Sequence, residues 1–222
     1  TGSAPTRPFE SATRATTVCR PFRSPGLIVP PVPMLPSSSE VHVTVLDSRW
    51  TDGDADYAPM LAWCQADLAA ASAATWKVVM YHKPSFDSTY HDAEPWGRDE
   101  FVPLFHRYGV DLVFTGHAHN YQRFVPMTSN AWPASTPVTY FVTGGGGAPL
   151  HAAAAHGYMA YTESVLSCAI VTINGQAVSI SARNNLDAEI DSVSWTKTAG
   201  MPDAAYLALA RPVQGFDARE LA

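Results

Sequence analysis

Residues 76–84 read Trp76-Lys77-Val78-Val79-Met80-Tyr81-His82-Lys83-Pro84, and residues 112–119 read Leu112-Val113-Phe114-Thr115-Gly116-His117-Ala118-His119. Each stretch begins with a short apolar run, rich in β-branched and aromatic residues, and ends in a loop that carries histidine. Such runs are typical of buried strands in a parallel sheet. Because ligands of open α/β sheets bind outside the carboxyl ends of the strands, we expect His82, His117 and His119 to lie at such a binding edge.

These loops have two interpretations. Histidine is the commonest metal ligand in proteins, so the loops could form a metal site. A single histidine at a strand end is more often a hydrogen-bonded loop residue. His117 and His119 lie two residues apart on an irregular loop, so they could face one metal ion or two adjacent ions. Gly116 permits the sharp exit from the strand that would turn both side chains to the sheet edge. Two such loops with a helix between them favour the metal site.

Hydrophobic patterning beyond Glu40 predicts an alternation of strands and helices. The predicted strands are 41–46, 76–81, 112–115, 138–143, 165–173 and 177–182, and the predicted helices are 59–71, 100–108 and a short one within 204–210. Gly109 should follow the second helix as its C′ residue. Asn174-Gly175, between two alternating runs, is a strong hairpin signal. This order is typical of an α/β sandwich with mixed sheets.

Composition excludes several classes of function. The chain has 222 residues, of which 46% are hydrophobic and 15% charged, so it can bury one sizeable core. A net charge of −6 without a basic stripe argues against nucleic acid as a partner. No stretch is long enough to span a membrane, and no signal peptide is visible. The cysteines, Cys19, Cys64 and Cys168, form neither a disulfide framework nor a zinc cluster, and we expect the last two to be buried.

The first 36 residues differ from the rest of the chain. They hold 8 of the 18 prolines and four arginines, but a single acid, Glu10. Nothing before Val41 alternates or recurs at helical spacing, so we expect residues 1–40 to be irregular. We divide the remainder into an α/β part, residues 41–190, and a tail, residues 191–222, with no visible role.

Two further groups of residues bear on the site. The glycines 144–147 are not followed by the Lys and Ser/Thr of a phosphate-binding Walker loop. We therefore expect them to form a turn beside the metal site, where the backbone must pass closely. His151 and His156 flank a run of alanines and should be exposed to solvent.

The two histidine loops resemble the last two metal-binding blocks of the calcineurin-like metallophosphoesterases. The resemblance rests on residues 79–84 and on Gly116-His117-Ala118-His119-Asn120-Tyr121-Gln122-Arg123. Tyr121 and Arg123, which follow the second histidine block, resemble the residues found there in the purple acid phosphatase branch of the family. The similarity extends over about residues 41–185. It implies an α/β fold that is part of a four-layer α/β/β/α sandwich, with mixed sheets and flanking helices.

The resemblance also implies a dinuclear centre of divalent or trivalent ions (Fe, Zn or Mn) that hydrolyses phosphomonoesters. His82 and His117 would bind one ion, and His119 the other. Two such ions would polarise the phosphoryl oxygens and generate a hydroxide nucleophile. In the family, a histidine after the first of these blocks often serves the leaving group or the phosphate. The candidate here is His91, which could equally be a polar residue of an exposed loop. An extracellular or periplasmic location is also implied.

In the family, the metal-binding blocks that carry carboxylates and asparagine precede the strand that corresponds to residues 41–46. Residues 1–40 of this chain contain none of these blocks. Gly53-Asp54-Ala55-Asp56-Tyr57 matches the family's Gly-Asp-x-x-Tyr, but it precedes a helical pattern, so we expect Asp54 in a surface loop away from the histidines. Imidazoles without a bridging carboxylate should hold divalent ions weakly. We expect the C-terminal half of a phosphatase, with a missing N-terminal half as its partner. The alternative is a non-catalytic remnant or interaction module that retains a partial metal site.

Overall fold

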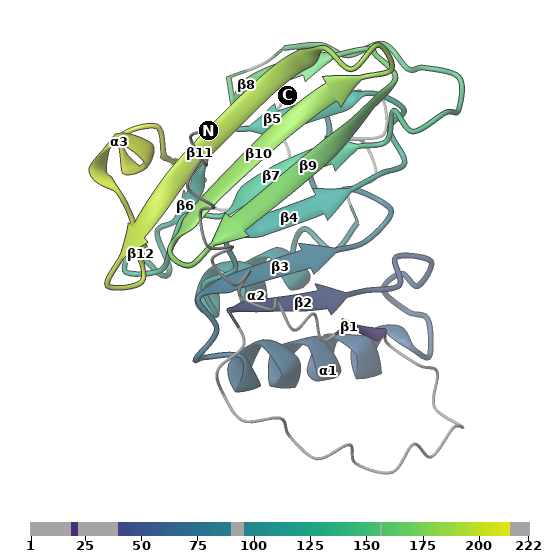
Figure 1. Ribbon diagram of the computed structural model, residues 1–222. Helices are drawn as coiled ribbons and strands as arrows, with labels where there is room; N and C mark the ends of the chain where they lie inside the picture. Colours follow the sequence, from purple (N-terminus) through teal and green to yellow (C-terminus); the bar gives the residue numbers. More distant parts are fainter. Residues whose placement is uncertain (1–18, 22–39, 90–95, 156, 214–222) are drawn as a thin grey trace, which may run out of the picture.

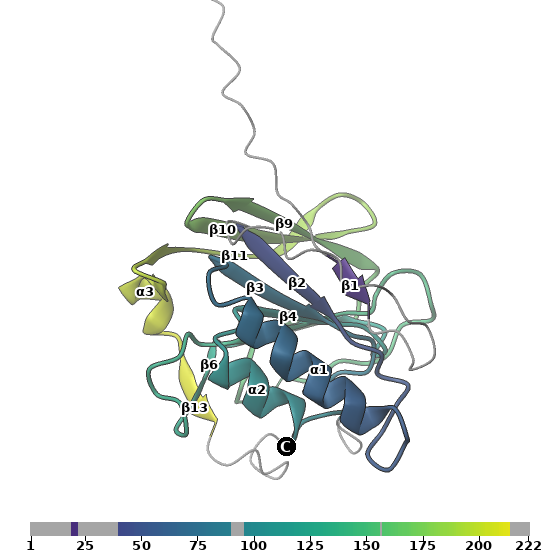
Figure 2. The same ribbon diagram turned by 90° about the horizontal axis from the view of Figure 1, so that it is seen from below.

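The computed structural model describes residues 19–21, 40–89, 96–155 and 157–213 of the chain. These residues form three layers, which are two helices, a large mixed sheet and a small antiparallel sheet (Figure 1). Figure 2 shows helices α1 and α2 against one face of the large sheet and strands β9–β11 against the other. No helix in the described part of the chain is long and apolar enough to cross a membrane.

The large sheet has seven strands in the order β1-β2-β3-β4-β7-β5-β8. They are β1 (Cys19–Pro21), β2 (Val41–Val45), β3 (Trp76–Met80), β4 (Leu112–Thr115), β5 (Tyr121–Phe124), β7 (Thr139–Thr143) and β8 (Met159–Glu163). Strands β1 to β4 and β7 are parallel, and β5 is antiparallel to both of its neighbours. Because Met80 pairs with Phe114 in the register, both histidine loops leave the sheet at the same edge.

The helices α1 (Tyr57–Ala70) and α2 (Phe101–Arg107) cover one face of this sheet. The buried residues of α1 recur at intervals of three and four along the helix, and they are Tyr57, Met60, Cys64 and Leu68. This spacing places them on one stripe, which packs into the main hydrophobic core. Gly109 follows α2 with a φ of +64°, which confirms its predicted place as the C′ residue.

The small sheet packs on the opposite face in the order β12-β11-β10-β9. Its strands are β9 (Ser167–Asn174), β10 (Ala177–Asn184), β11 (Glu189–Thr198) and β12 (Met201–Pro202). Asn174 pairs with Ala177 across a two-residue turn, and Gly175 has a φ of +56°, which confirms the predicted hairpin. Val178, Ile180 and Trp195 form a second core with residues of the large sheet. Together with the helices, the two sheets confirm the expected α/β sandwich with mixed sheets.

The remaining elements are short. Strands β6 (Met127–Ser129) and β13 (Arg211–Val213) form a two-stranded parallel sheet, and α3 (Ala204–Leu207) lies where a short helix was expected. Asp203 caps α3 by accepting a hydrogen bond from the Tyr206 N–H at 3.0 Å.

Three sequence-based expectations about the strands and the cysteines differ from the structure. Cys19–Pro21, within the segment expected to be irregular, is a strand that pairs with β2. Residues 191–198, assigned to the tail, belong to β11, the longest strand described. Cys64 is buried as expected, but Cys168 is exposed, because it lies on β9 at the edge of the small sheet and points away from the large one.

Candidate metal site

The first histidine loop is fastened to the end of β2. Ser48 Oγ accepts hydrogen bonds from the backbone N–H groups of His82 (3.2 Å) and Lys83 (2.8 Å). The Gly116 N–H donates to the His82 carbonyl at 3.0 Å, which continues the pairing of β3 with β4 into the loops. The backbone of His82 is therefore held by hydrogen bonds both to the chain after β2 and to the chain after β4.

The second loop turns sharply at His117, which has a φ of +64° in the left-handed region. This conformation is uncommon for a residue other than glycine and often marks a functional position. His117 Nδ1 lies 3.2 Å from His82 Nε2, and the two rings stand edge to face with centroids 5.1 Å apart. The two imidazoles thus meet at the carboxyl edge of the large sheet.

The spacing of these two nitrogens suits a metal ion. Two nitrogens bound to one zinc at about 2.0–2.1 Å, in tetrahedral geometry, lie roughly 3.3 Å apart. The 3.2 Å between His82 and His117 matches this separation, and it equally suits a hydrogen bond between the two rings. In the described ranges, however, no group of three or more His, Cys, Asp or Glu side chains is arranged to hold a metal ion. The imidazole pair therefore fits part of one ion's ligand set, and the ligand role of these residues stays a prediction.

His119 has different neighbours from His82 and His117. Its Nδ1 lies 2.8 Å from the Pro149 carbonyl, and because a carbonyl only accepts, Nδ1 carries the proton. The lone pair of the neutral ring is consequently on Nε2, the arrangement common in metal-binding histidines. His119 also stacks on His151, with centroids 4.2 Å apart at 24°. The assignment of His119 to a second ion stays a prediction.

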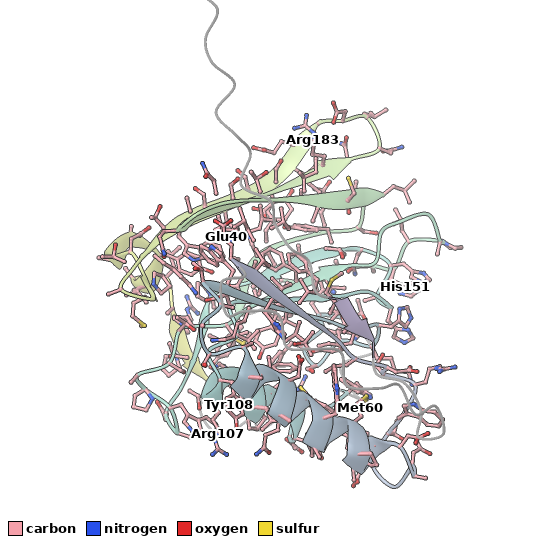
Figure 3. All side chains as sticks on the ribbon, turned by 60° about the horizontal axis from the view of Figure 1, so that its bottom comes forward. Glu40, Met60, Arg107, Tyr108, His151 and Arg183 are labelled. Atoms are coloured by element: carbon pink, nitrogen blue, oxygen red, sulfur yellow. The ribbon has the colours of Figure 1, made fainter. Side chains whose placement is uncertain are left out.

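His151 is half-buried instead of exposed, because it pairs with the His119 loop. The two residues exchange two hydrogen bonds: the side-chain Nδ1 of His151 accepts from the His119 N–H at 3.2 Å, and the His151 N–H donates to the His119 carbonyl at 2.9 Å. Figure 3 shows His151 beyond the carboxyl ends of the strands of the large sheet. His91 and His156 lie outside the described residues.

The glycine turn passes closely beside the histidine loop, as expected. A Cβ on Gly144 would lie 2.0 Å from the Ala118 carbonyl oxygen, and one on Gly145 would lie 2.3 Å from the Val165 carbonyl oxygen. Neither position can accept a side chain without movement of the backbone. Gly146 differs, because a Cβ there would meet nothing within 4 Å.

Replacing Gly144 with alanine should push Ala118, and with it the two flanking histidines, out of place. We expect the free energy of unfolding to fall by about 1–3 kcal/mol, as for other overpacked sites. Zinc affinity should fall about 10–100-fold, as when a supporting contact of a metal ligand is lost. Thermal unfolding and calorimetric zinc titration would measure both. The control is Gly146→Ala, and equal effects of the two variants would contradict the role of the close approach.

Asp54 lies in an exposed loop before α1. Its carboxylate accepts hydrogen bonds from the N–H (2.7 Å) and the hydroxyl (3.0 Å) of Thr51, and these bonds lower the pKa of Asp54. The N-cap residue of α1 is Asp56, which makes no side-chain capping bond. The Asp54 carboxylate is therefore engaged in a local turn, as expected from its sequence context.

Comparison with known proteins supports the resemblance. Residues 32–121 match the sequence model of the calcineurin-like phosphoesterase family. An acid phosphatase of Aspergillus ficuum is 39% identical over 70 residues, which are 31% of this chain and 11% of that protein. Purple acid phosphatase 18 of Arabidopsis thaliana is 33% identical over 112 residues, 48% of this chain and 25% of that protein. The chain is therefore similar to calcineurin-like phosphoesterases, and the similar proteins include purple acid phosphatases.

The fold of the chain agrees with that of a solved structure. The purple acid phosphatase PPD1 from yellow lupin seeds superposes with a TM-score of 0.59 over 80% of this chain and 34% of that chain, at 18% identity. This likeness shows the shared fold. The chain spans about a tenth to a quarter of the length of the curated relatives described above.

Tyr121 and Arg123, the residues that resemble the purple acid phosphatase branch, form hydrogen bonds between the two sheets. Tyr121 and Arg123 point from β5 towards the small sheet, where both bind the Asp191 carboxylate. Sequence reasoning missed Ser48 and Gln122, whose side chains form hydrogen bonds with residues of the histidine loops. The position of Ser48 just after β2 mirrors that of His82 after β3, and this was the available signal.

Proposed function

We propose that the chain is part of a metal-dependent phosphoric ester hydrolase of the acid phosphatase type, acting on phosphomonoesters. The observation that carries the proposal is the 3.2 Å approach of His82 Nε2 to His117 Nδ1, within a segment that matches the phosphoesterase family. These two residues would hold one ion, and His119 Nε2 would serve a second. Zinc, iron or manganese would polarise the phosphoryl oxygen and lower the pKa of a bound water.

The chain's own contribution would be to orient these ligands. The Pro149 carbonyl keeps the proton of His119 on Nδ1, and Ser48 holds the backbone of His82. We further propose that the carboxylate donors of a complete centre come from polypeptide outside the described residues, such as an N-terminal half acting as partner. We also propose an extracellular or periplasmic location for this protein, because the resemblance to purple acid phosphatases implies one.

Binding of zinc and inorganic phosphate tests the proposal without requiring turnover. We expect weak zinc binding that is lost in His82→Ala and His117→Ala, and phosphate binding that requires zinc. The control is His42→Gln, because His42 lies near the start of β2, at the opposite end of the strand from the site. Phosphate affinity that is the same with and without zinc would contradict the proposal, as would zinc affinity that is unchanged in both alanine variants.

Turnover of p-nitrophenyl phosphate by the chain alone should be low with zinc, iron or manganese. Loss of a single supporting contact costs about 10–100-fold in affinity or activity, so a centre without its carboxylates should lose more. Rapid turnover that disappears in His117→Ala would instead mean that the imidazole set suffices.

A second candidate is a non-catalytic remnant or an interaction module with a partial metal site. The observation that favours it is the lack of any group of three metal-binding side chains in the described part of the chain. Zinc binding without zinc-dependent phosphate binding would support this candidate.

A further inference from the structure

Gln122 lies between the two histidine loops and is fully buried. Its Oε1 accepts a hydrogen bond from the Ser88 N–H at 2.9 Å. Its Nε2 donates to Asp87 Oδ1 at 2.5 Å and to Asn120 Oδ1 at 2.9 Å. Asp87 is 3% exposed and Asn120 is 0% exposed, so the network is shielded from water.

The partners of Gln122 belong to both loops of the candidate site. Asp87 and Ser88 follow His82 by five and six residues, and Asn120 directly follows His119. Asp87 also accepts hydrogen bonds from the N–H and the hydroxyl of Thr89, which closes a local turn. A single side chain thus joins the loop after β3 to the loop after β4.

Only a primary amide satisfies all three contacts. The Asp87 carboxylate is an acceptor and the Ser88 N–H is a donor, so these partners dictate which end of the amide faces each loop. Glutamate has the same shape but no donor, and it would bury a second negative charge beside Asp87. A hydrocarbon side chain would leave the buried Asp87, Asn120 and Ser88 groups without these partners, which is unfavourable.

We propose that Gln122 is a positioning residue that fixes the two histidine loops against each other and thereby sets the spacing of His82 and His117. It acts through the Asp87 turn on one side and Asn120 on the other, without contacting the ion. Its link to metal binding rests on the proposed function. The effect on the spacing of the two rings does not, because this spacing is defined without a metal.

The decisive variant is Gln122→Glu, compared with the double variant Gln122→Glu/Asp87→Asn. In the double variant the asparagine amide can donate to the new carboxylate, which restores this donor–acceptor pair with its roles exchanged and removes the second negative charge, while the Thr89 N–H loses its acceptor. Gln176→Glu makes the same chemical change in the exposed turn between β9 and β10 and serves as the control. If Gln122→Glu does not fold, Asp87→Ala removes one acceptor and carries the same expectation.

The metal-independent measurement is the nuclear Overhauser effect between the ring protons of His82 and His117. We expect it to be lost in Gln122→Glu, restored in the double variant and retained in Gln176→Glu. Zinc affinity should fall about 10–100-fold and recover in parallel. A ring contact that persists in folded Gln122→Glu would overturn the positioning role. Loss of the ring contact with unchanged zinc affinity would instead count against the proposed metal site.

Discussion

Replacing Arg123 with methionine is expected to lower the free energy of unfolding by about 3–5 kcal/mol, because the variant leaves a buried carboxylate without its cation. Arg123 Nε and Nη2 each donate to the Asp191 carboxylate at 2.7 Å, and the Tyr121 hydroxyl donates to it at 2.9 Å. The side chains of Arg123 and Asp191 are 12% and 6% exposed. This ion pair joins β5 of the large sheet to β11 of the small sheet, so its loss should loosen the contact between the sheets.

Urea-induced unfolding of four variants would distinguish the contribution of the ion pair to stability from that of its surroundings. Asp191→Leu should cost a similar amount, since it leaves Arg123 buried and unpaired, and Arg123→Met/Asp191→Leu should recover part of the loss. The control is Arg183→Met in the pair with Asp187, whose Nε–Oδ1 distance is 2.6 Å but whose carboxylate is 87% exposed. That variant should cost less than about 1 kcal/mol. Equal losses from Arg123→Met and Arg183→Met would contradict the importance of burial.

Acid is expected to destabilise the protein through His106. This side chain is fully buried in α2, and its burial lowers the pKa from 6.5 to about 4. Between these two values the unfolded chain holds a proton on His106 that the folded chain does not, so stability rises with pH. The contribution is complete above about pH 6.5 and is lost as the pH falls towards 4. The pKa difference corresponds to roughly 3 kcal/mol.

Urea unfolding at about pH 7 and pH 4.5 would measure this contribution. Carboxylates also titrate in this range, so the informative quantity is the difference between the wild type and His106→Leu. The wild type should lose most of an additional 3 kcal/mol or so on acidification, and the variant should lack this part of the loss. Parallel losses in both proteins would contradict the expectation. Assays of the proposed phosphatase activity should accordingly be run near pH 6.5 or above, where the fold retains this contribution.

Local signals determined much of the fold and part of the site. The apolar runs of β3 and β4, the spacing of the buried residues of α1, and Gly109 and Gly175 all act within a few neighbouring residues, so sequence reasoning found them. The approach of His82 to His117 follows from two parallel strands that end at one edge. The pairing of His119 with His151 was not predictable, because it depends on how a distant glycine turn folds back.

Strand β11 illustrates what only the tertiary structure decided. Its inward-facing positions alternate regularly, but two of them, Asp191 and Lys197, are charged, which hid the apolar pattern of a strand. Lys197 Nζ lies 2.7 Å from Asp111 Oδ1, and Asp191 binds Arg123. Each partner is more than 60 residues distant in the sequence. A charged side chain is buried in a core at acceptable cost only when it is paired with an opposite charge. Sequence alone determined the local elements and the histidine-bearing edge, whereas the joining of the two sheets and the fixing of the site's loops depended on buried polar partners that only the folded chain brings together.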